Sequence, residues 1–94
     1  MIEWSEQALC QLDQARDFIA LSNSQEIAAR IGMQIFTSVE QLDAFPALGR
    51  TGRVRGTREL VVPNTPFVVA YEIQKARIYI LAIYHGAQRW PESF

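Results

Sequence analysis

Apolar and polar positions follow a helical period over the first half of the chain. Apolar side chains three and four residues apart predict an amphipathic helix over about 6–21, formed by Leu9, Leu12, Ala15, Phe18 and Ile19. A second stripe predicts a helix that reaches about residue 44, formed by Ile27, Ile31, Ile35, Val39 and Leu42. Ser5 is a candidate N-cap for the first helix, and Asn23 with Glu26 resembles a capping box for the second. The short connection predicts an antiparallel helical hairpin.

The second half of the chain has the composition of β-strands. Four segments are predicted as strands, the first of them a short edge strand: 2–4, 59–62, 67–73 and 77–84. Residues 74–76 predict a short hairpin connection without an Asn-Gly pair, and the two strands they join should be central. We therefore expect an α+β fold. An N-terminal strand and a helical hairpin should pack on one face of a small antiparallel sheet, leaving the opposite face partly open.

Length and composition restrict the kind of protein. The chain has 94 residues, 49% hydrophobic and 20% charged, which predicts a single domain over 1–94 with a packed core. One cysteine and one histidine exclude an internal disulfide, a cysteine zinc cluster and a multi-histidine metal site. There is no signal-peptide pattern and no membrane-spanning stretch. We expect a soluble, cytoplasmic domain without metal or other cofactor and without membrane contact.

Charge divides unevenly along the chain. Residues 1–49 carry two basic and seven acidic side chains, whereas residues 50–89 carry seven basic and two acidic ones. Four of those cations fall within nine residues: Arg50, Arg53, Arg55 and Arg58. Guanidinium groups bind phosphates and carboxylates, so this segment could contact nucleic acid or an acidic polypeptide. The alternative is a solvated loop whose arginines form surface ion pairs with the acidic helices.

The end of the last strand is the second candidate region. His85 has the one side chain suited to proton transfer near neutral pH, Arg89 could stabilise a phosphate, and Trp90 could stack on a base or fill a groove of a partner. The alternatives are that His85 holds the turn at Gly86 and that Trp90 is a packing residue that ties down the C-terminal end. Tyr71 lies on a predicted central strand, where tyrosines mostly pack.

Several short motifs resemble, in order and spacing, those of the RelE/ParE superfamily of bacterial toxins. They are residues 2–5 with Ala8 and Leu12, residues 42–46 with Gly49 and Arg50, and residues 54–61, 67–71 and 80–85. The run 54–61 looks like the family's arginine followed by a strand. Residues 67–71 resemble its strand ending in tyrosine, here Tyr71, and 80–85 its closing strand with a terminal histidine. The resemblance spans nearly the whole chain.

This resemblance implies a toxin of a type II toxin–antitoxin module, a growth inhibitor of the kind associated with plasmid stabilization. A cognate antitoxin would hold the toxin inactive in a hetero-oligomer, and operator DNA would be reached only through that antitoxin. An amphipathic or extended segment of the antitoxin should lie in the apolar groove beside the sheet.

The superfamily implies two possible targets. ParE-like members poison DNA gyrase and are not nucleases, whereas RelE-like members cut ribosome-bound mRNA without a metal. Val68 stands where the ribonucleases often carry arginine, and Gly86 where some carry tyrosine, so the sequence departs from the ribonuclease pattern. The strand-end histidine followed by a polar and proline-containing tail looks closer to the ParE-like branch. The residues implied to bind target or antitoxin are Arg50, Arg53, Arg55, Tyr71 and Trp90. In the alternative, an mRNA interferase acting on the ribosome, the catalytic residues would be His85, Arg58 and Arg89. A third possibility is an inactive binding module of the same fold.

Overall fold

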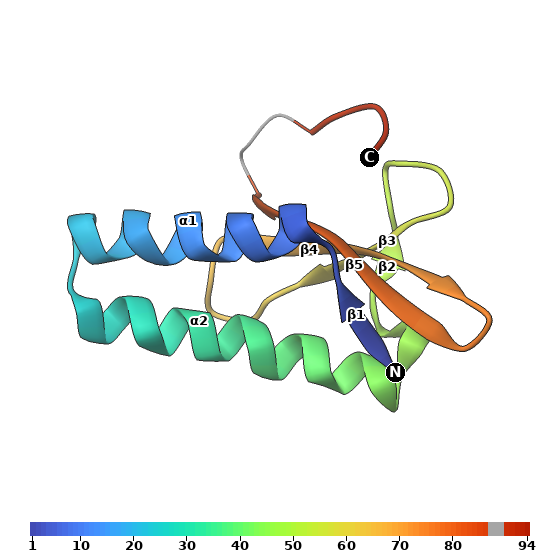
Figure 1. Ribbon diagram of the computed structural model, residues 1–94, viewed down its shortest axis with the longest axis horizontal. Coiled ribbons are helices and arrows are strands. Elements are labelled where there is room, and N and C mark those ends of the chain that lie inside the picture. The colour runs from blue at the N-terminus through green and yellow to red at the C-terminus, as the bar shows by residue number, and fades with distance from the viewer. Residues whose placement is uncertain (87–89) are drawn as a thin grey trace.

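The computed structural model describes residues 1–86 and 90–94. The chain forms a strand, two helices, two short 3-10 turns and four further strands (Figure 1). They are β1 (Ile2–Trp4), α1 (Glu6–Ser22), α2 (Gln25–Glu40), η1 (Gln41–Asp43), η2 (Pro46–Leu48), β2 (Arg50–Thr51), β3 (Arg58–Val61), β4 (Phe67–Gln74) and β5 (Arg77–His85). Both predicted helices and all four predicted strands are present. Strand β2 is an additional strand inside the arginine-rich segment.

The strands form one sheet in the order β1-β5-β4-β3-β2. Neighbouring strands are antiparallel, except that β1 at the edge runs parallel to β5. Strands β4 and β5 are interior, as their apolar sequences predict. The two helices run side by side in opposite directions (Figure 1), and both contribute side chains to one core with the sheet. The predicted α+β fold is therefore confirmed. No helix within the described residues is long and apolar enough to cross a membrane.

A serine begins each helix. The Ser5 hydroxyl accepts a hydrogen bond from the Ala8 N–H at 3.0 Å, as predicted for the first helix. At α2 the cap is Ser24, whose hydroxyl accepts from the Ile27 N–H at 3.1 Å. The prediction that Asn23 caps α2 is wrong, because the Asn23 N–H donates to the Ile19 carbonyl and closes α1. The second helix also ends at Glu40, and the expected continuation to about residue 44 is the 3-10 turn η1.

A β-bulge in β5 changes which sheet face its side chains occupy. Ala70 pairs with Ala82 and Tyr71 pairs with Ile80, so Leu81 is an extra residue without an opposite partner. Side chains alternate between faces along a strand, and one extra residue reverses that alternation. Ile80 consequently belongs to the core under the helices, whereas Ala82 belongs to a separate cluster.

The second cluster lies on the face of the sheet opposite the helices, which we call the open face. It consists of Ala70, Ala82 and Tyr84, and Trp90 packs against it. The sequence predicted a partly open face, and the structure shows that residues near the C-terminus cover part of it. The backbone N–H of Ser5 donates to the Ile80 carbonyl at 2.9 Å, so the residue that begins α1 also holds β5 next to the bulge.

Candidate functional site: the arginine loop and the C-terminal segment

The arginine loop, residues 50–58, is organised around one carboxylate. Glu59 on β3 has only 3% of its side chain exposed, and it accepts from the guanidinium groups of Arg50 and Arg53 at 3.0 and 3.1 Å. The backbone N–H of Arg53 donates to the same carboxylate at 2.8 Å. The loop arginines therefore pair with their own neighbouring strand. The ion pairs expected between the loop and the acidic helices are not among those of the described residues.

These contacts determine the ionisation of Glu59. Burial raises the pKa of the carboxyl, but the hydrogen bonds from the Arg53 backbone, Arg53 side chain and Arg50 side chain together outweigh burial. The pKa of Glu59 is lowered below its ordinary value, so the group is a carboxylate at neutral pH. A buried negative charge thus holds two arginines whose side chains remain half-exposed, at 55% and 45%.

Tyr71 anchors the segment that enters the loop. Its hydroxyl donates to the Pro46 carbonyl at 2.7 Å and accepts from the Gly49 N–H at 2.9 Å. Gly49 must be glycine here, since a Cβ atom would lie 2.7 Å from the Tyr71 ring. The ring of Tyr71 is fully buried, and this burial raises the pKa of its phenol. In this structure the Tyr71 hydroxyl holds the backbone at Pro46 and Gly49, just before the loop. The side chain has no exposed surface with which to contact a partner.

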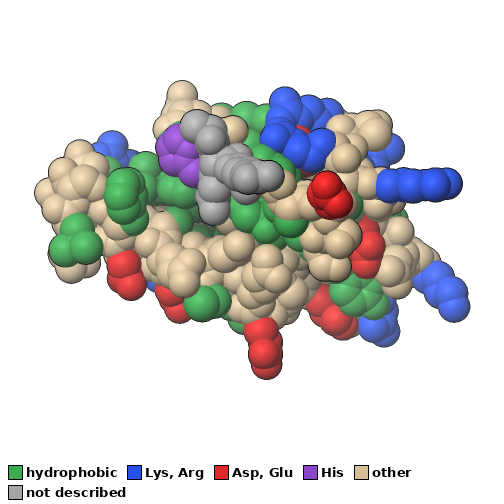
Figure 2. Space-filling view, turned by 90° about the horizontal axis from the view of Figure 1, so that it is seen from above, with side chains coloured by type: hydrophobic (Ala, Val, Ile, Leu, Met, Phe, Trp, Pro, Cys, Tyr) green, Lys and Arg blue, Asp and Glu red, His purple; other side chains and the backbone are tan. Residues whose placement is uncertain are grey.

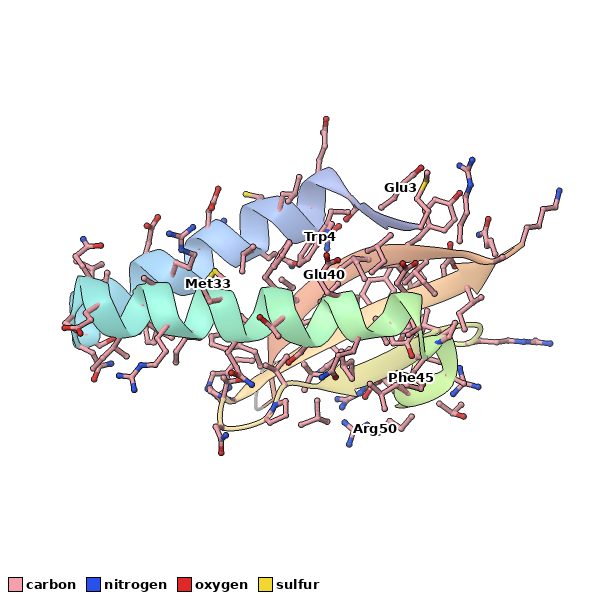
Figure 3. All side chains as sticks on the ribbon, turned by 90° about the horizontal axis from the view of Figure 1, so that it is seen from below. Glu3, Trp4, Met33, Glu40, Phe45 and Arg50 are labelled. Atoms are coloured by element: carbon pink, nitrogen blue, oxygen red, sulfur yellow. The ribbon has the colours of Figure 1, made fainter. Side chains whose placement is uncertain are left out.

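The remaining loop arginines differ in their surroundings. Arg58 Nη1 donates to the Gly49 carbonyl at 2.8 Å, which directs its guanidinium toward the start of the loop. Arg55 is exposed, next to Gly56, whose φ of +82° favours glycine. From above, Lys and Arg side chains gather mainly at the end of the molecule away from the turn between the helices (Figure 2). From below, Phe45 and Arg50 lie just beyond the end of α2 (Figure 3).

Trp90 joins the C-terminal segment, residues 90–94, to the sheet and to the loop. Its ring centroid lies 4.8 Å from that of Tyr84, and the Phe94 ring lies 6.1 Å from Tyr84. The Arg53 guanidinium carbon is 3.9 Å from the centre of the Trp90 ring, within cation–π range. Trp90 is therefore a packing residue in this structure, in agreement with the simpler of the two interpretations of the sequence.

His85 is the last residue of β5 and pairs with Phe67, the first residue of β4. Its ring meets the edge of Phe67 at 6.0 Å, and it lines a hollow between α1 and the ends of β4 and β5 with Gln11 and Phe18. Arg89, the third residue of the ribonuclease alternative, lies outside the described residues.

The structure thus brings together Arg50, Arg53 and Trp90. His85 directly follows Tyr84, on which Trp90 packs, but it lines the hollow beside α1 and not the open face. Sequence reasoning missed Glu59, the residue that organises the loop. A carboxylate next to four arginines indicates ion pairing. Its burial, however, depends on how β2, β3 and β4 pair, and that register could not be predicted from the sequence.

The chain is similar in sequence or structure to known proteins. Residues 2–90 match the family described as "ParE toxin of type II toxin-antitoxin system, parDE". The protein named "Putative toxin Y4kP" from Sinorhizobium fredii (strain NBRC 101917 / NGR234) is 37% identical over 91 residues, covering 97% of this chain and 93% of that protein. The solved structure titled "Chromosomal ParDE TA system from P. aeruginosa" superimposes with a TM-score of 0.84 at 26% identity, covering 89% of this chain and 92% of that one.

The fold and these matches define a small toxin of the RelE/ParE type. The chain belongs to the ParE toxin family of type II toxin–antitoxin systems, whose matched region extends through nearly its full length. The resemblance found in the sequence is confirmed, and membership of this family implies an antitoxin protein as partner.

Proposed function

We propose that this toxin inhibits DNA gyrase and that a cognate antitoxin neutralises it. The observation that carries the choice of target is the separation of the residues that mRNA cleavage would need. General acid–base catalysis requires the participating groups within about 3 Å of the atoms that exchange protons. Among the described residues, Arg58 and His85 lie on strands that are not neighbours, four positions apart along the strand between them.

The strand register gives the scale of that separation. Arg58 pairs with Tyr71, whereas His85 pairs with Phe67, four residues away along β4. Four residues of a strand span about 13 Å, and β3 is two strand spacings from β5, about 10 Å more across the sheet. Arg58 is also directed toward the Gly49 carbonyl. Arg58 is thus held away from His85 among the described residues, which favours a toxin that acts by binding.

Two further positions favour the same target. Val68, where ribonuclease members often carry arginine, is buried and pairs with Val61 and Tyr84 on the neighbouring strands. Gly86 follows the terminal histidine and has no aromatic side chain. The surface available for binding gyrase is the basic end of the molecule, with the exposed Arg55 in the loop. Trp90 packs on the sheet beside it and keeps part of its surface exposed. Arg50 and Arg53 contribute from fixed positions, because Glu59 holds them.

A supercoiling assay with purified components tests the target. The wild-type chain should inhibit the negative supercoiling of relaxed plasmid by gyrase and should leave ribosome-bound mRNA intact. Arg55→Glu should weaken inhibition at least tenfold, since it reverses a charge on the proposed contact surface. Arg30→Glu is the matched control: an exposed arginine on α2, whose reversal should leave inhibition within twofold. Cleavage of ribosome-bound mRNA with no effect on supercoiling would overturn the proposal.

A further inference from the structure

One guanidinium group contacts both the loop and the C-terminal segment. Arg53 Nε donates to Glu59 Oε2 at 3.1 Å and its Nη2 donates to Glu59 Oε1 at 3.3 Å. The Cζ atom of the same group lies 3.9 Å from the centre of the Trp90 ring. Arg53 thus connects a buried carboxylate, that of Glu59 on β3, to the indole of Trp90 in the C-terminal segment.

The two contacts of Arg53 depend on each other geometrically. Two hydrogen bonds to one carboxylate fix the plane of a guanidinium group, and a fixed plane is what an indole can stack on. The backbone N–H of Arg53 also donates to Glu59 at 2.8 Å, so the carboxylate restrains both ends of this residue. Arg50 shares Glu59, but its described contacts do not include Trp90.

Small side chains on the open face leave room for the contact between Arg53 and Trp90. Glu59 pairs with Ala70 and Ala70 pairs with Ala82, so the three residues form a row across β3, β4 and β5. Two alanines in the row leave space above the sheet for large groups. Trp90 packs against these alanines and Tyr84.

Nothing in the described residues accepts a hydrogen bond from Trp90. Its Nε1 atom is buried and has no partner among residues 1–86 and 90–94. Among the described residues, the indole is therefore held by ring packing and by the Arg53 contact rather than by a hydrogen bond. Arg53 is thus the contact that joins the indole to the arginine loop, whereas Tyr84 and the alanines join it to the sheet.

We propose that Glu59 is a positioning residue for the C-terminal segment. By fixing the plane of the Arg53 guanidinium, Glu59 keeps Trp90 in place on the open face, and we call this set of contacts the latch. The latch joins the arginine loop and the C-terminal segment into one continuous surface. This latch goes beyond the proposed function and does not depend on which target the toxin binds. Release of Arg53 would expose Tyr84 and the two alanines together with the indole.

Tryptophan fluorescence tests the latch on the purified full chain. The sequence has two tryptophans, so a Trp4→Phe background leaves Trp90 as the single reporter. In that background Arg53→Gln should raise the Stern–Volmer constant for acrylamide at least twofold and shift the emission to longer wavelength. Arg50→Gln is the matched control, because it removes the other guanidinium from Glu59 without removing a contact to Trp90. It should change the constant by less than a third of that increase.

The role of Glu59 has its own test. Glu59→Gln should raise acrylamide access to Trp90 although Arg53 and Trp90 are both unchanged. Unaltered access in a Glu59→Gln chain with a wild-type circular dichroism spectrum would overturn the role of Glu59. If Glu59→Gln does not fold, the comparison of Arg53→Gln with Arg50→Gln tests the latch instead. Equal quenching in Arg53→Gln and Arg50→Gln, or no increase in Arg53→Gln, would overturn the latch. Inhibition of gyrase enters none of these measurements, so the latch and the proposed function can fail separately.

Discussion

The carboxylate of Glu59 binds two guanidinium groups and a backbone N–H while it is almost fully buried. Such a group stabilises the folded chain only in its charged form. Because its pKa in the folded chain is below the ordinary 4.5, its contribution is present above pH 4.5. That contribution is lost as the pH falls through the lowered pKa.

Glu59→Gln should therefore lower the free energy of unfolding by about 1.5–3 kcal/mol at pH 7, the range for hydrogen bonds to charged groups. The difference from wild type should shrink as the pH falls below 4.5. Urea denaturation between pH 7 and pH 3 measures both effects. Glu40→Gln, an exposed carboxylate on α2, is the control. An equal deficit for Glu59→Gln at both ends of this range would contradict the assignment.

Tyr71 is a second residue whose hydroxyl contributes through two partners. Tyr71→Phe leaves the buried Gly49 N–H without its acceptor, which should cost about 1–3 kcal/mol. For a chain of this size, each kcal/mol lowers the Tm by roughly 4–8 °C. Amide exchange at Gly49 should also accelerate. Tyr79→Phe, whose ring is only partly buried, should leave both measurements near wild type. Unchanged exchange at Gly49 would refute the anchoring role.

At the scale of elements, the hairpin between β4 and β5 has an unfavourable turn. Lys75 and Ala76 both have positive φ, 47° and 66°, a conformation typical of a type I′ turn. Glycine and asparagine adopt it easily, whereas alanine does not. The hairpin could be predicted without the usual turn residues, because the two flanking segments have the composition of strands and only a short connection separates them.

Ala76→Gly should consequently stabilise the protein, by about 1 kcal/mol, since it removes a steric penalty at an exposed turn. Thermal denaturation should show an increase of a few degrees in Tm. Ala44→Gly is the opposite case: Ala44 has an ordinary φ of −87°, so glycine there adds only unfolded-state entropy and should lower the Tm. A fall in Tm for Ala76→Gly would mean that the turn is not left-handed.

The helices, the interior strands and the Ser5 cap could all be predicted, because each depends on local periodicity or on one side chain. The α2 cap could not, since Asn23 and Ser24 are equally good caps and only the geometry of the connection decides between them. The bulge at Leu81 was equally hidden. A strand that is apolar on both faces carries no signal of which residues face the helices, so the place of Tyr84 on the open face required the register.

The molecule as a whole has a basic end and, beside α1, an apolar hollow. Phe18 is 67% exposed and lines a hollow of about 260 Å³ with Ala15, Phe67 and Ile83. An apolar groove of this kind suits the amphipathic segment of an antitoxin. Candidate site residues could be named from the sequence as a set of arginines, but their grouping could not. Arg50 and Arg53 are held because they pair with the buried carboxylate of Glu59, whereas Arg55 is exposed to solvent. The burial of Glu59 could not be predicted from the sequence.

Phe18→Ser should weaken binding of the cognate antitoxin at least tenfold, since burying a phenylalanine contributes about 1.5–3 kcal/mol. Met33→Ser is the matched control. Met33 is exposed to a similar extent, 62%, but lies on α2 outside the lining of the hollow (Figure 3). Isothermal titration of both variants with the cognate antitoxin measures the contrast. Equal loss in the two variants would place the antitoxin elsewhere.

Expression of this chain alone in bacteria, with pulse labelling of DNA and protein synthesis, tests the central claim most directly. A gyrase poison stops DNA synthesis first, and filamentation and DNA-damage signalling should follow while protein synthesis continues. Co-expression of the cognate antitoxin should restore both. An early arrest of protein synthesis, with DNA synthesis still running, would contradict the account and assign the toxin to mRNA cleavage.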